Sequence, residues 1–382
     1  MKRHLVQLDS LRGMAAMTVV FGHLLYIYPY FEPNTSQNME YFWLNIVKYS
    51  PLHIIFDGHG AVILFFVLSG FVLALPYYRE NFESQYIPYI IKRFFRIYVP
   101  YIIMLAFASL LAFPFIGDLV QEGSDFVTRI WSTEIGIQDI LNHILFIGSY
   151  DTKQLNPVIW SLIHEMRISI IFPFIMMVVL RFNWKNVICF AGFLSIIGFI
   201  VLRIPILSIG GLTSLGYTIH YIGIFMVGAL LAKYYQTIVH WLKEKNTFFK
   251  GFLLLLAVCL YSYSFLFYNV SLAHIFIIDD WFTVIGAIIF ISISLASIRL
   301  TNVLKWKPIH YIGEISYSLY LVHLPIILFM VHLLDNLIPT SLILLLSFMN
   351  SLLFASLSYY FVEIPSIKMG AKIAEKKKEN SN

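Results

Sequence analysis

Ten stretches of about twenty largely apolar residues run through this chain, and they constrain its fold more than any other feature. They lie near residues 11–30, 60–78, 97–117, 158–180, 187–206, 216–235, 248–268, 281–298, 311–334 and 340–362. Roughly 20 apolar residues let a helix cross the hydrocarbon core of a bilayer. Only 12% of the 382 residues are charged, whereas soluble domains hold about 25%. We therefore predict an all-α polytopic membrane protein with about ten transmembrane helices.

The placement of basic residues predicts the orientation of these helices. If both termini are cytoplasmic, 21 of the 26 lysines and arginines fall on the cytoplasmic side and Arg167 falls within a span. The four on the outer side are Lys48, Arg129, Lys153 and Arg203. Cytoplasmic loops normally carry such an excess. We therefore predict a multi-pass protein of the inner or plasma membrane whose partner is the lipid bilayer. We predict no nucleic-acid partner, because the basic residues form no single patch.

Two segments outside the predicted helices have a distinct composition. The outer segment 118–157 is acidic and contains the amphipathic stretch IQDILNHILFIG, for which we expect a helix at the membrane interface. We assign residues 1–365 to the transmembrane domain. The remaining residues, 366–382, are predicted to form a short basic cytoplasmic tail without ordered structure.

The first apolar segment, LDSLRGMAAMTVVFGHLLYIY, carries two residues that are costly in a bilayer, Arg12 and His23. Eleven residues make about three helical turns and a rise of about 16 Å, so both side chains project from one face at different depths. This geometry suits a long ligand with an anionic end near the cytoplasm and a reactive end near the midplane. The alternatives are that Arg12 reaches lipid phosphates and that His23 bonds a backbone carbonyl.

Depth along the helices brings further residues to the level of His23. Glu165, His323 and Ser69 all fall near the middle of their spans, so they could meet His23 if these helices pack together. A carboxylate beside a histidine orients the ring and makes it a workable general base. Ser69 could instead mark close helix packing, as Ser-Gly pairs do. These residues lack metal-ligand spacing such as HExxH, so we predict no metal.

A second basic group precedes the third span. Arg93 and Arg96 are three residues apart and share a helix face on the cytoplasmic side, as Arg12 does. Three guanidinium groups there could hold the phosphates of a nucleotide. The general excess of basic residues in cytoplasmic segments of membrane proteins explains Arg93 and Arg96 equally well.

Five motifs, taken together and in order, resemble those of the acyltransferase-3 family of integral membrane O-acyltransferases. They are SLRGMAAMTVVFGH from Ser10 to His23, FFVLSG at residues 65–70, RFFR from Arg93 to Arg96, WSLIHE from Trp160 to Glu165, and SYSLYLVH from Ser316 to His323. The resemblance covers about residues 5–365.

The resemblance implies transfer of an acyl group, usually acetyl, from cytoplasmic acyl-coenzyme A to a hydroxyl of a glycan or lipid-linked sugar outside. By carry-over, Arg12, Arg93 and Arg96 would hold coenzyme A, and His23 would be the essential base. Glu165 would orient or relay protons. Supporting roles would fall to His323, Tyr317 and Ser69.

Two features depart from the family pattern. Many relatives carry an additional extracytoplasmic domain, whereas this chain ends after a short tail, so we expect it to work either alone or with a separate extracytoplasmic partner protein. Arg167 stands where an uncharged residue is expected, and it either neutralises a buried carboxylate or contacts an anionic substrate.

Other functions also fit a membrane protein with buried charges. A secondary transporter or exporter of a small anionic or acylated compound is the main alternative, although internal repeats typical of carriers are not evident in the sequence. A glycan polymerase or ligase fits less well, because the outer segment 118–157 is acidic.

Overall fold

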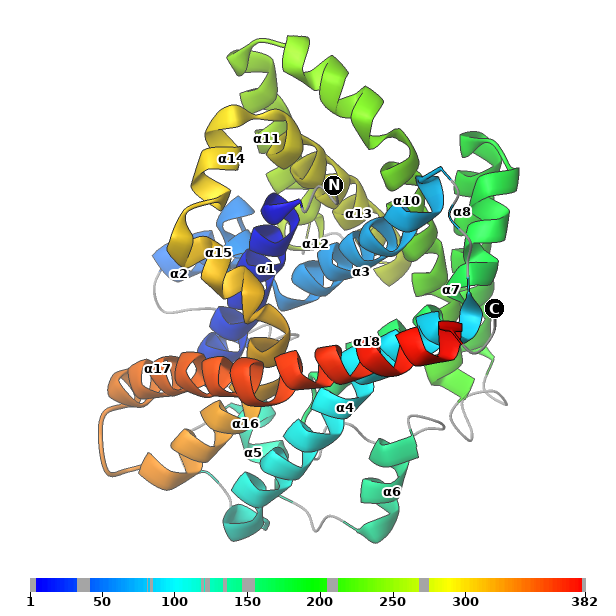
Figure 1. The fold of residues 1–382 in the computed structure, drawn as a ribbon. Helices are drawn as coiled ribbons and strands as arrows, with labels where there is room; N and C mark the ends of the chain where they lie inside the picture. Colours follow the sequence, from blue (N-terminus) through cyan, green and yellow to red (C-terminus); the bar gives the residue numbers. More distant parts are fainter. Residues whose placement is uncertain are drawn as a thin grey trace.

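The computed structural model describes residues 5–32, 42–80, 82, 85–117, 120, 124–132, 136–145, 155–204, 212–267 and 275–379. All regular secondary structure in these ranges is helical, as predicted for an all-α membrane protein (Figure 1). The acidic residues Asp118, Glu122, Glu134 and Asp151 of the outer segment lie outside the described ranges.

Each predicted span corresponds mainly to one of ten helices. These helices are α1 (Val6–Leu25), α3 (Gly58–Ala74), α4 (Tyr86–Ala112), α7 (Ile159–Arg181), α8 (Trp184–Arg203), α10 (Leu212–Glu244), α11 (Thr247–Tyr261), α13 (Phe276–Ala296), α16 (Ser316–Leu334) and α17 (Thr340–Ser358). Eight helices in the described part of the chain are long and apolar enough to cross a membrane. The other two predicted spans are α1, whose apolar face is interrupted by Asp9 and Arg12, and α11, which has 15 residues.

Short helices connect these ten, and a further helix, α18, follows the last of them. They are η1 (Pro29–Phe31), α2 (Phe42–Lys48), η2 (Pro51–Ile55), η3 (Leu75–Tyr78), η4 (Phe113–Phe115), α5 (Asp125–Arg129), α6 (Ile137–Leu145), α12 (Tyr263–Leu266), α14 (Ile298–Leu304), α15 (Lys307–Glu314), the π-helical turn η6 (Tyr359–Glu363) and α18 (Ile364–Glu379). The stretch expected to form an amphipathic helix in the outer segment is α6. The predicted span 311–334 is divided, because the chain changes direction between α15 and α16.

The prediction that the C-terminal residues lack ordered structure is wrong. Residues 364–379 form α18, which continues from α17 through η6 and lies along α4 (Figure 1). Gly370 packs so tightly against Phe95 of α4 that an added Cβ would lie 2.5 Å from the Cβ of Phe95. The charged residues of AEKKKE suggested a solvated segment. However, α18 also has a face of small residues, Ser366, Gly370 and Ala374, and all three are buried.

Close helix packing fixes the centre of the molecule. At the crossing of α3 and α10, a Cβ on Gly70 would lie 2.2 Å from the Phe225 carbonyl oxygen, so only glycine fits there. Helix α1 contacts α3, α15 and α16, which places it inside the bundle. The sequence left open whether Ser69-Gly70 marks close helix packing or a functional residue. Gly70 makes the close packing contact, so the side chain of Ser69 is available for another role.

Candidate functional site

A cavity of about 680 Å³ opens among α1, α3, α4, α7, α15, α16 and α18, and we call it the arginine cavity. Three arginines line it, Arg12 from α1 and Arg93 and Arg96 from α4. The spacing of Arg93 and Arg96 predicted a shared helix face, and both side chains do reach this cavity. Arg12 comes from a different helix, so the three cations are assembled by tertiary packing.

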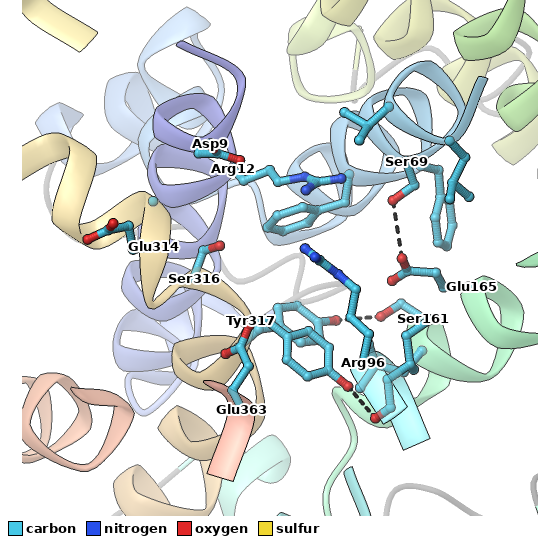
Figure 2. Close-up of a pocket in the computed structure, with 18 of the residues that line it drawn as sticks. Asp9, Arg12, Ser69, Arg96, Ser161, Glu165, Glu314, Ser316, Tyr317 and Glu363 are labelled. Atoms are coloured by element: carbon cyan, nitrogen blue, oxygen red, sulfur yellow. Dashed lines mark hydrogen bonds between the residues drawn. The ribbon is translucent and has the colours of Figure 1, made fainter. Parts of the chain in front are cut away.

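Two of these arginines are unpaired within the described residues. Neither Arg12 nor Arg96 forms a hydrogen bond or ion pair there, although both line the cavity. Figure 2 shows their guanidinium groups extending into the same space from different helices. Two guanidinium groups that share one cavity and have no hydrogen-bonded partner among the described residues favour an anionic ligand between them, because guanidinium groups pair well with phosphate and carboxylate oxygens.

The third arginine, Arg93, is paired with Glu165. Its Nη2 donates to Glu165 Oε1 at 3.2 Å and to Ser169 Oγ at 2.9 Å. Ser69 Oγ donates to the same Glu165 oxygen at 3.2 Å (Figure 2). The carboxylate is therefore held by one cation and one hydroxyl on the wall of the arginine cavity.

Three further carboxylates line the arginine cavity from α1, α15 and η6. Glu314 lies 3.8 Å from His310 Nε2, and Glu363 accepts a hydrogen bond of 2.7 Å from Ser318 Oγ. Asp9 lies one helical turn before Arg12. Figure 2 shows Glu314 and Glu363 on the side of the cavity opposite Glu165, so the cavity offers hydrogen-bond acceptors as well as cations.

A second cavity, of about 210 Å³, lies at the other end of α1, and we call it the histidine cavity. His23 lines it together with Tyr26 and Phe126. The ring of His23 stacks on Phe126 of α5 with centroids 5.6 Å apart. Helix α5 is held against the end of α1, because Ser124 N–H donates to the Ile27 carbonyl at 3.1 Å and Ser124 Oγ donates to the Tyr26 carbonyl.

The hydrogen bonds of His323 define the tautomer of His23. His323 Nδ1 lies 2.9 Å from the Leu319 carbonyl oxygen, which can only accept, so Nδ1 carries the proton. The Nε2 atom of neutral His323 is then an acceptor, and His23 Nδ1, at 3.0 Å, must donate to it. This leaves His23 Nε2 with a lone pair. The general base predicted at His23 is therefore oriented by a histidine that is fixed by its own helix.

The arginine cavity and the histidine cavity have a common boundary. Val62 of α3 and Tyr320 of α16 line both of them. The Tyr320 hydroxyl donates to the Val158 carbonyl at 3.0 Å and lies 2.7 Å from Ser161 Oγ. A ligand held by the arginines thus needs to pass this boundary to reach His23.

The four residues that were expected to lie at one depth in the membrane form two separate pairs in the structure. His23 contacts His323, and Ser69 contacts Glu165 in the arginine cavity. The partner that orients His23 is accordingly His323, whereas the expectation from depth was Glu165. Depth along a helix did not resolve this difference, because residues at similar depth face different neighbours.

The two remaining predicted residues have defined partners. Arg167 Nη1 donates to Ser214 Oγ at 2.6 Å and to Thr218 Oγ1 at 3.2 Å, both on α10. The cation beside Glu165 is Arg93. Tyr317 lines the arginine cavity, and its hydroxyl donates to the Ile97 carbonyl at 2.7 Å, which ties α16 to α4.

Sequence analysis missed three residues of this region. His59 and Trp160 line the histidine cavity, and Tyr320 lines both cavities. His59 lay one residue outside the predicted span 60–78, so it was not examined as a membrane residue. Trp160 and Tyr320 fall within the motifs WSLIHE and SYSLYLVH, but their chemistry alone did not mark them.

One group outside the spans also titrates near the histidine cavity. Asp57 caps the N-terminus of α3, accepting from Gly60 N–H at 2.8 Å. Burial raises the pKa of Asp57 to about 6, although this hydrogen bond and the neighbouring His59 act in the opposite direction.

A helical membrane bundle in which a cavity lined by three arginines adjoins a cavity that presents a histidine lone pair is suited to group transfer. A family model described as an acyltransferase domain matches residues 5–360, and the chain belongs to this acyltransferase-3 family. It is a multi-pass membrane acyltransferase. No curated protein and no solved structure matches it.

Proposed function

We propose that this acyltransferase moves an acetyl group from cytoplasmic acetyl-coenzyme A to a hydroxyl of a glycan or lipid-linked sugar at the cell envelope. The observation that carries the proposal is the common boundary of the two cavities at Val62 and Tyr320. One cavity offers unpaired guanidinium groups and the other offers a histidine base. Coenzyme A has its phosphates at one end of a long arm and its thioester at the other.

The donor's phosphates bind Arg12 and Arg96 in the arginine cavity, since guanidinium forks match phosphate oxygens. Arg93 is already paired with Glu165, so it contributes by holding the wall and by its remaining hydrogen-bond donors. On α1, the rise of about 16 Å between Arg12 and His23 separates phosphate binding from chemistry. The basic excess predicted on the cytoplasmic side supports an arginine cavity that is reached from the cytoplasm.

In the chemical step, His23 Nε2 takes the proton of the acceptor hydroxyl as its oxygen attacks the thioester carbonyl carbon. The carbon–sulfur bond then breaks, the ester remains on the acceptor, and the coenzyme A thiolate takes the proton from His23. Throughout the step, His23 Nδ1–H donates to His323 Nε2. This bond strengthens when His23 becomes positively charged.

The test uses the purified full-length protein in nanodiscs with [14C]acetyl-coenzyme A, and an envelope polysaccharide extract as acceptor. Release of free coenzyme A and transfer of label to the extract are measured for wild type, His23→Ala and Arg12→Ala. Arg181→Ala is the matched control for Arg12→Ala, because Arg181 is an exposed arginine at the end of α7.

We expect His23→Ala to abolish release while donor binding persists, and Arg12→Ala to raise the KM for acetyl-coenzyme A. Arg181→Ala should behave as wild type. If wild-type protein neither binds nor cleaves acetyl-coenzyme A in the presence of the extract, the proposal is wrong, and a transporter of anionic compounds becomes the better explanation of the two cavities.

A further inference from the structure

A second histidine lines the histidine cavity and is oriented by a buried carboxylate. His59, in the first turn of α3, lies 2.6 Å through Nε2 from Asp280 Oδ1 of α13. The His59 side chain is 51% exposed, whereas that of Asp280 is 1% exposed. The His59 ring is nearly parallel to that of Trp160, with centroids 6.1 Å apart. The ring is thus fixed at one nitrogen and across one face.

The carboxylate of Asp280 is held by a network from three helices. Its Oδ2 lies 3.0 Å from His220 Nε2 of α10. His220 Nδ1 lies 2.9 Å from Ser195 Oγ of α8, which accepts from Trp281 Nε1 at 3.1 Å. A carboxylate buried within a membrane bundle is costly and marks a functional site by default. This network leads, through Asp280, to the one group of the cluster that faces the histidine cavity, His59.

Charge balance places a positive charge on His59. A buried carboxylate needs a compensating cation nearby, and its two contacts are His59 and His220. Both nitrogens of His220 are bonded and its side chain is fully buried, so a charge there is poorly solvated. His59 faces the cavity, where water or a ligand solvates it. Within the described residues, His59 Nδ1 has no hydrogen-bond partner, so an imidazolium at this position offers Nδ1–H to a bound molecule.

The surroundings of His23 favour its neutral form, whereas those of His59 favour its positively charged form. The chain of hydrogen bonds through His323 leaves His23 neutral with a lone pair at Nε2, whereas Asp280 favours a positively charged His59. Pairs of groups that are held apart in this way divide the acid and base roles of a reaction. The cavity that both line, about 210 Å³, is smaller than a typical small-molecule site, so one reacting centre can contact both rings.

We propose that His59 is a catalytic residue of the acyl transfer, donating from Nδ1–H to the thioester carbonyl oxygen. As the acceptor oxygen adds to the carbonyl carbon and His23 takes its proton, negative charge moves onto the carbonyl oxygen and is stabilised by His59. When the carbon–sulfur bond breaks, the carbonyl reforms and His59 keeps its proton. Asp280 is the positioning residue. This role rests on the proposed acyl transfer.

The test compares His59→Ala, His59→Lys and Asp280→Asn with wild type in nanodiscs. Acetyl-coenzyme A is the donor and the envelope extract is the acceptor, and both kcat and the donor KM are measured. His240→Ala is the control, because His240 is an exposed histidine on α10 that contacts only Glu244 among the described residues. Equilibrium binding of [14C]acetyl-coenzyme A shows that each variant is folded.

Removing one donor to a developing oxyanion lowers kcat on the order of 100-fold or more. We expect that loss for His59→Ala, with an unchanged donor KM, a loss in the same direction for Asp280→Asn, and partial recovery in His59→Lys, which restores a cation. A wild-type kcat in His59→Ala, a loss confined to KM, or equal loss in the lysine and alanine variants would overturn the assignment and leave acyl transfer standing. Absence of donor binding and cleavage in the wild type would overturn acyl transfer itself.

Discussion

The tautomer of His23 can be tested by replacing His323, because the two rings exchange one hydrogen bond whose direction the structure defines. In His323→Leu, His23 Nδ1–H loses its acceptor at 3.0 Å, and the side chain at position 323 remains apolar and of similar volume. In the proposed reaction His23 becomes positively charged, and a hydrogen bond to a charged group contributes about 1.5–3 kcal/mol. At 1.36 kcal/mol for each factor of ten, kcat should fall roughly 10- to 150-fold.

The assay is continuous detection of free coenzyme A with a thiol-reactive dye, at saturating acetyl-coenzyme A. His323→Gln is the matched variant, because its amide oxygen can accept from His23 Nδ1–H in place of the imidazole. We expect the glutamine variant to retain most of the wild-type rate and both variants to bind the donor normally, since His323 does not line the arginine cavity. Equal rates for the leucine variant and wild type would refute the orienting role.

Three further predictions concern binding, packing and pH. Arg96→Ala should raise the KM for acetyl-coenzyme A about tenfold or more, as expected when a charge-assisted hydrogen bond is lost, while Arg181→Ala leaves it unchanged in the same titration. Gly70→Ala places a Cβ 2.2 Å from a backbone carbonyl oxygen of α10. It should lower the free energy of unfolding by about 1–3 kcal/mol and so lower the melting temperature in a thermal-shift assay. Gly192→Ala, with open space around it, is the control, and equal melting temperatures for the two variants would contradict the packing account. Burial lowers the pKa of His53 from 6.5 to about 3, so the unfolded chain binds a proton that the folded chain does not, and this residue reduces stability as pH falls from 6.5 toward 3. His53→Phe should therefore lose less thermal stability than wild type between pH 7 and pH 5, and parallel losses would show that His53 does not titrate in this way.

Much of the architecture could be predicted from the sequence because membrane spans are encoded locally. A run of about twenty apolar residues has few alternatives to a transmembrane helix, and the predicted spans correspond to α1, α3, α4, α7, α8, α10, α11, α13, α16 and α17. Local reading failed at α18, where a run of lysines suggested a solvated tail. The side of α18 that contacts α4 consists of small residues, and small residues carry little hydropathy signal.

Four candidate site residues could be identified from the sequence because charged and histidine side chains are costly within an apolar span. Arg12, His23, Glu165 and His323 were found in this way, and all of them lie in or beside the two cavities. The pairing of these residues was not predictable, because it depends on how the helices are rotated against one another; the sequence left open whether Glu165 meets His23, and in the structure Glu165 contacts Arg93 and Ser69.

His59 and Asp280 were missed for a different reason. Each lies within one residue of a predicted span boundary, at 60 and at 281, and sequence-based boundaries are uncertain by several residues. A search for buried charges that stops at those boundaries omits the first turn of each helix. In this protein, the ion pair between His59, in the first turn of α3, and Asp280, near the start of α13, lies just outside those predicted boundaries.

The layer formed by Val62 and Tyr320 also has a consequence for the cell that contains this enzyme. If the arginine cavity is reached from the cytoplasm and the histidine cavity from the other side, as proposed, the two cavities shorten the distance over which the membrane insulates one compartment from the other. The hydrogen bonds of the Tyr320 hydroxyl to Val158 and Ser161 hold the ring in place as part of this insulation. Under the proposed acyl transfer, this boundary has to admit a slender acyl chain while keeping protons and ions from leaking along the same route, so we expect the size of the residue at position 320 to affect membrane leakage as well as the transfer rate.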